Sequence, residues 1–207
     1  MIGIGIFAAA MSSAHAIPST VAGTVISNGS VTLGVINMFD VSSDSAQGAI
    51  EFSLAGVSNP VSSALLQVFD LSSATSFPGN TLVNIFGYTG DGALSFAGDF
   101  DAGGATSIGS FTFVDGQVAP FEVDVTAFVN SLIGTAGFAG FNLRLGETSE
   151  FVDLQGQNGS PDTNPQLILT ADNGNIDEVS EPGTVALLGI GLLGICAATR
   201  GRKRKPA

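Results

Sequence analysis

Apolar and polar residues alternate with a period of two along much of the chain between residues 17 and 170. In residues 121–126, which read FEVDVT, the three apolar side chains share one face of an extended strand and the polar ones share the other. Each such segment is expected to bury one face and to expose the other to water. Seven more strands are predicted, at Ile50–Leu54, Ala64–Phe69, Leu82–Phe86, Ser107–Val114, Ala139–Leu145, Phe151–Leu154 and Gln166–Thr170.

Turn-forming sequences separate these strands, for example SNP at residues 58–60 and PGN at 78–80. One short helix is predicted at Ala127–Ile133, with Thr126 as its N-cap and Gly134 at its end. Short strands at this spacing predict an all-β fold, an antiparallel β-sandwich of the jelly-roll type, over residues 17–170. Its core is predicted to contain Phe121, Val123, Val125, Phe141, Leu143 and Leu167.

The charge of this body is strongly one-sided. Residues 17–180 carry seventeen acidic residues and one basic residue, Arg144, so they repel the phosphate backbone of nucleic acids. The same residues contain no His, Cys, Lys or Trp. That composition excludes His- or Cys-based nucleophilic catalysis, Schiff-base chemistry, and zinc sites built on His and Cys. We therefore expect neither an enzyme nor a nucleic-acid-binding protein.

The N-terminal residues 1–16 have the pattern of a secretory signal peptide. An apolar run is followed by small polar residues and by Ala14-His15-Ala16, an A-x-A cleavage pattern. Cleavage is predicted after Ala16. A basic region before the apolar run is missing, which suggests that translation starts upstream of Met1.

The C-terminal residues predict a single transmembrane helix. Residues 183–199 form a stretch without charge, and a helix of this length spans about 25 Å, slightly less than the roughly 30 Å of a bilayer core. A basic cluster follows, and it should remain in the cytoplasm and leave the acidic body outside. It consists of Arg200, Arg202, Lys203, Arg204 and Lys205. Residues 171–178 would be a linker.

These C-terminal parts together resemble a PEP-CTERM sorting signal over residues 179–205. The motif at 179–184 reads VSEPGT, followed by the apolar helix 183–199 and the basic tail 200–205. Ser180 replaces the first proline of Pro-Glu-Pro, while Glu181 and Pro182 keep their places. The resemblance implies recognition of Ser180, Glu181 and Pro182 by an exosortase in the inner membrane of a Gram-negative bacterium, removal of the tail, and transfer of the body to the surface. A plain tail anchor is the alternative.

The body itself resembles a DNRLRE-type jelly roll, a domain related in shape to carbohydrate-binding modules. The resemblance covers residues 61–170, and its best part is the DVT sequence at 124–126 before the predicted helical turn. It implies a place on bacterial surface proteins. The absence of Trp departs from the sugar-stacking surfaces common in such folds.

One candidate metal site lies in the Gly-rich segment GDGALSFAGDFDAGG. Asp91, Asp99 and Asp101 offer hard oxygen ligands that suit Ca²⁺, although their spacing is not that of an EF-hand. The alternative is that these carboxylates are solvated turn residues. Arg144 is expected to pair with Asp153 or Glu150.

The sequence thus predicts an exported structural or interaction protein of the bacterial surface or extracellular matrix. Its partners would be an exosortase, extracellular polysaccharide in a biofilm and, before processing, the membrane. The alternative function is a calcium-dependent glycan-binding module.

Overall fold

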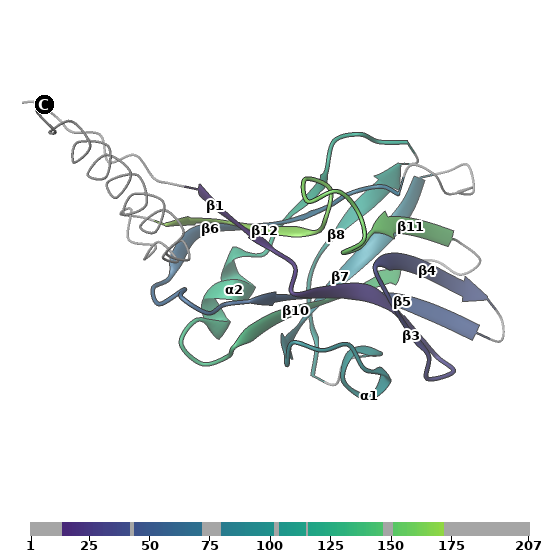
Figure 1. Ribbon diagram of the computed structural model, residues 1–207, viewed down its shortest axis with the longest axis horizontal. Coiled ribbons are helices and arrows are strands. Elements are labelled where there is room, and N and C mark those ends of the chain that lie inside the picture. Colours follow the sequence, from purple (N-terminus) through teal and green to yellow (C-terminus); the bar gives the residue numbers. More distant parts are fainter. Residues whose placement is uncertain are drawn as a thin grey trace, which may run out of the picture. The chain divides into compact units, whose positions relative to one another are not determined.

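The computed structural model describes residues 14–41, 44–71, 80–101, 104–114, 116–146 and 151–171. They all lie within the unit Met1–Ile176. The described residues form two sheets (Figure 1). The smaller sheet has the strand order β1 (Ala14–Pro18), β12 (Gln166–Ala171), β6 (Val61–Val68) and β9 (Phe121–Asp124).

The larger sheet has eight strands. Its main order is β11 (Phe151–Gln155), β4 (Val35–Val41), β5 (Asp44–Ser53), β10 (Phe138–Leu145), β7 (Asn80–Gly90) and β8 (Thr106–Val114). A branch adds β2 (Val21–Ile26), which pairs with β5 and with β3 (Val31–Leu33). Every strand pair among the described residues is antiparallel. The predicted all-β, antiparallel class is therefore confirmed, and its arrangement is consistent with a sandwich.

The inner faces of the two sheets share one apolar core in which phenylalanine dominates. Phe141 on β10 contacts Phe52 on β5 and Phe128, with ring centroids 5.7 and 5.6 Å apart. Phe121 of the smaller sheet stacks on Phe111 of the larger sheet at 4.9 Å, which joins the two layers. Phenylalanine suits this position because it buries a large area without a polar atom that needs a partner.

The strand alternation predicted from the sequence decides which side chains enter this core. All six residues predicted to be buried are at most 8 % exposed. The opposite faces of β5, β7 and β10 carry Glu51, Tyr88 and Asn142, and these are buried as well. They are covered by the loop of residues 91–101, here called the cover loop, which includes the short helix α1 (Phe96–Asp99). Figure 1 shows α1 on the side of the larger sheet that faces away from β6 and β12.

Helix α2 (Thr126–Leu132) packs against β6 and β10, near the predicted position. The sequence predicted Thr126 as its N-cap, but the N-cap is Val125, and no side chain caps the helix. The hydroxyl of Thr126 instead accepts a hydrogen bond from the Ala64 N–H at 2.8 Å, which ties the helix start to β6. Gly134 has φ +78°, so the predicted glycine terminator is confirmed.

Strands β1 to β4 were not predicted. Residues 14–16 of β1 were assigned to the signal peptide, and the residues of β2, β3 and β4 alternate poorly. In β2 five of the six residues are buried, since both faces of this strand are covered. In the sequence of such a strand, apolar and polar residues do not alternate between the two faces.

No helix among residues 14–171 that the structure describes is long and apolar enough to cross a membrane. The predicted transmembrane helix at residues 183–199 lies outside the described residues.

Candidate functional site

The predicted sorting residues have no described geometry. Ser180, Glu181 and Pro182, together with the basic cluster at 200–205, lie outside the described residues. The predicted cleavage residues Ala14 and Ala16 lie in β1, where they pair with Thr170 and Ile168 of β12. Cleavage after Ala16 would thus leave two of the five residues of β1 on the mature chain.

The most unusual chemistry among the described residues lies under the cover loop. Glu51 on β5 is fully buried, and its carboxylate accepts hydrogen bonds from the N–H groups of Asp91 at 3.2 Å and Gly92 at 2.5 Å. Tyr88 on β7 donates its hydroxyl to the Asp99 carboxylate at 2.6 Å, and the Ser95 N–H donates to the other oxygen of Asp99 at 2.5 Å. The two buried carboxylates therefore hold the start and the end of the cover loop.

Burial raises the pKa of Glu51 to about 7; donation from the Gly92 N–H opposes this shift, and the negative charge of Asp99 adds to it. Burial, together with the hydrogen bond to Asp99, raises the pKa of Tyr88 well above its usual range. A carboxyl group that titrates near neutral pH can serve in proton transfer. Here Glu51 is fully buried and accepts from the backbone of the cover loop, an arrangement suited to holding the loop.

Glycine 140 makes this packing possible. A Cβ atom at Gly140 on β10 would lie 2.5 Å from the ring of Tyr88, closer than side chains approach one another. The ring of Tyr88 therefore lies flat against the backbone of β10, which brings its hydroxyl to Asp99.

A second row of polar contacts runs beside the first. Gln47 on β5 donates to the Asp101 carboxylate at 2.7 Å, and its side-chain oxygen accepts from the Asp101 N–H at 3.0 Å. Asn142 on β10 donates to the carbonyl oxygen of Asp99 at 2.8 Å. Arg144 donates through Nε to Asn142 and forms an ion pair with Asp101 at 3.1 Å. Its guanidinium carbon also lies 4.3 Å from the centre of the Phe86 ring.

These contacts correct the expectation for Arg144, which pairs with Asp101 on the cover loop and not with Asp153. Glu150, the other expected partner, lies outside the described residues. The correction has a simple cause. Sequence alternation places Arg144 on the outer face of β10 but does not reveal that a loop returns over that face.

The three carboxylates considered for calcium do not share a site. Asp99 is buried against Tyr88, Asp101 pairs with Arg144, and Asp91 accepts a hydrogen bond from the Ala93 N–H within its own turn. Among the described ranges between residues 14 and 171, no three His, Cys, Asp or Glu side chains are grouped to hold a metal.

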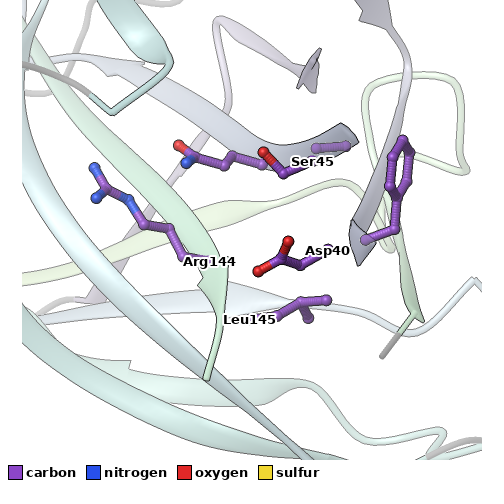
Figure 2. A pocket seen from close by; sticks show the side chains of 7 residues that line it. Asp40, Ser45, Arg144 and Leu145 are labelled. Carbon is purple, nitrogen blue, oxygen red and sulfur yellow. The ribbon is translucent and has the colours of Figure 1, made fainter. Parts of the chain in front are cut away.

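A hollow of about 160 Å³ opens to solvent beside Arg144. Figure 2 shows the Asp40 carboxyl group and the Ser45 hydroxyl directed into it. This volume is below the roughly 300–1,000 Å³ of pockets that enclose a drug-sized ligand, so the hollow suits one ring or one polar group of a larger molecule. It is lined by Phe39, Asp40, Ser45, Ala46, Gln47, Arg144 and Leu145.

Sequence reasoning missed Glu51, Tyr88 and Asp40 as members of these sites. Glu51 lies between Ile50 and Phe52 in a strictly alternating strand, so it was expected to face water. No local signal reveals this burial, because the two rings of the cover loop, Phe96 and Phe100, stack on each other and Phe96 remains 40 % exposed.

Comparison with known proteins bears on the C-terminus. Residues 178–204 match the PEP-CTERM protein-sorting motif, which supports a secreted protein that an exosortase sorts to the cell surface. No curated protein matches this chain.

Proposed function

We propose that this protein is a structural or interaction protein of the Gram-negative cell surface or extracellular matrix, associated with exopolysaccharide in biofilms. The single observation that carries the proposal is the sorting motif at residues 178–204. The acidic body and its lack of His, Cys and Lys between residues 17 and 180 agree with a non-enzymatic role. The body would be a jelly roll that reaches the surface after export.

The route to the surface involves a transient anchor in the inner membrane. Residues 183–199 would cross the membrane as a helix, and the basic residues after Thr199 would stay in the cytoplasm. An exosortase would then cut near Glu181-Pro182. Pro182 fixes its own φ and favours an extended Glu181, which is the conformation that proteases generally bind.

Mass spectrometry of surface protein tests this route. Protein from a strain with an active exosortase should lack the peptide 183–205, and Glu181→Ala should leave the tail uncleaved. Asp177→Ala and Glu178→Ala remove neighbouring charges and serve as matched controls that should be processed normally. Recovery of the intact tail on surface protein would replace the sorting proposal with a simple tail anchor.

Replacement of the basic cluster tests the orientation of the tail. With Arg200, Arg202, Lys203, Arg204 and Lys205 all changed to Gln, the stop that retains the tail is removed and the protein should be misdirected. Fractionation of the cells measures this outcome. Unchanged membrane retention would contradict the proposed role of the cluster.

A second candidate function is glycan binding, and the hollow beside Arg144 favours it. Asp40 and Ser45 offer an acceptor and a hydroxyl to sugar hydroxyl groups, and Phe39 offers a ring to an apolar sugar face. A glycan array with the full-length chain should then show binding of one sugar class that Phe39→Ala weakens. Leu33→Ala, at an exposed position on β3, is the matched control. No binding by the wild-type chain would retire this candidate and leave the sorting proposal unaffected.

A further inference from the structure

A pair of buried oxygen atoms lies at the edge of the larger sheet, away from the cover loop. Asp153 on β11 is the direct cross-strand partner of Asn37 on β4. The two side chains therefore leave the same face of the sheet, with their Cβ atoms roughly 5 Å apart. Asp70 lies next to them, since it forms a β-bridge with Leu154, and the N–H of Leu71 donates to the carbonyl oxygen of Asp153 at 3.2 Å.

Each of the two side chains has one buried acceptor atom without a donor. Asp153 is 7 % exposed. Its Oδ1 and the Oδ1 of Asn37 are both sealed from water, and neither accepts a hydrogen bond from any residue that the structure describes. A buried carboxylate oxygen that lacks a partner is strongly unfavourable, so a native structure usually supplies a donor or a cation there.

The charges around Asp153 also favour a bound cation. Burial raises the pKa of Asp153, and the negative charge of Asp70 raises it further. Asp70 is itself nearly buried, with one carboxylate oxygen accepting from the Gly116 N–H at 2.7 Å. The body has one base, Arg144, and that base is paired with Asp101. No other basic side chain in residues 17–180 can neutralise Asp153.

We propose that Asp153 and Asn37 bind one calcium ion, with Asp70 supplying a second negative charge beside it. Carboxylate and amide oxygens are the hard ligands that calcium takes, and calcium tolerates an irregular set completed by backbone oxygens or water. Zinc prefers nitrogen and sulfur ligands, and magnesium demands a near-ideal octahedron. The ion would fasten the β4–β11 edge of the larger sheet to the segment that follows β6 of the smaller sheet.

Thermal unfolding of the full-length chain tests the site. Starting in chelator, addition of calcium should raise Tm until the rise saturates, because calcium binds the native state. Potassium chloride at equal ionic strength should not reproduce the rise. Asp153→Asn keeps the shape of the side chain and removes its charge, so it should abolish the rise and weaken calcium affinity in equilibrium dialysis by about tenfold or more.

The melting temperature of Asp153→Asn in chelator shows whether this variant still folds. In chelator, Asp153→Asn should melt at the wild-type temperature or above it, since it removes a buried negative charge beside Asp70. The double variant Asp91→Asn, Asp101→Asn removes two carboxylates of the cover loop and should retain the full calcium response. The proposal is overturned if wild-type Tm and dialysis show no calcium binding at millimolar concentration. It is equally overturned if Asp153→Asn keeps the response, or if the cover-loop variant loses it.

Discussion

The two faces of strands β5, β7 and β10 are both buried, but by different kinds of contact. The inner face carries apolar residues such as Phe52, Ile85 and Phe141, which pack against the smaller sheet without any hydrogen-bond requirement. The outer face carries Glu51, Tyr88 and Asn142, whose polar atoms are matched by the cover loop. Apolar burial depends on volume and shape, whereas polar burial depends on each partner being in place. The two faces should therefore respond differently to substitution.

The largest expected effect comes from the inner face. Phe141→Ala removes a fully buried ring that contacts two other rings, and it should lower the free energy of unfolding by about 3–5 kcal/mol. Urea denaturation of the full-length chain measures this loss. Val118→Ala, at a position that is 95 % exposed, should change stability by less than about 0.5 kcal/mol. A similar loss in both variants would mean that Phe141 is not in the core.

A smaller effect is expected on the outer face. Tyr88→Phe keeps the ring against Gly140 but removes the hydroxyl that donates to Asp99, so a buried carboxylate loses a donor. The expected cost is about 1–3 kcal/mol. Ser62→Ala removes an exposed hydroxyl that donates to the Thr170 carbonyl, and it should cost less. Equal costs measured by urea denaturation would show that the polar layer is not effectively buried.

The outer face should also make stability depend on pH. The pKa of Glu51 is about 7 in the folded chain and near 4.5 when unfolded, so the folded state binds more protons between these values. The free energy of unfolding should then fall as pH rises from about 4.5 to 7, by at most about 1.4 kcal/mol per pH unit. The groups that face Glu51 are Asp91, Asp99 and Tyr88.

Glu51→Gln should flatten this dependence, because the amide oxygen still accepts from the cover loop and no longer titrates. Glu122→Gln, at an exposed position on β9, is the control and should leave the slope unchanged. The measurement is Tm as a function of pH. A wild-type slope of the opposite sign would contradict a protonated Glu51 in the folded state.

The smallest effect is expected at the rim of the polar layer. Asp101 pairs with Arg144, but its side chain is 62 % exposed, so Asp101→Asn should cost no more than about 1 kcal/mol and less at high salt. Asparagine is chosen because Asp101 has φ +48°, which asparagine tolerates. A loss as large as that of Tyr88→Phe would place Asp101 with the buried groups.

The sequence by itself determined the parts of the fold that depend on the alternation of apolar and polar residues along one strand. Alternation along residues 121–126 and 139–145 predicted strands and the direction of Phe121, Phe141 and Leu143, because a strand reverses its face at every residue. The sorting motif was also readable, since its recognition depends on a continuous stretch of chain. Both predictions rest on neighbours in sequence.

Only the tertiary structure decided what lies over the outer face. Glu51 and Arg144 alternate with apolar residues as solvent-facing residues do. The cover loop lies about forty residues away from each of them, and no residue near them in sequence indicates its presence. The pairing of Asp153 with Asn37 likewise depends on strand order, which places β11 beside β4. Whether a polar side chain meets water, a donor or another acceptor is set by such distant segments, and local pattern carries no information about them.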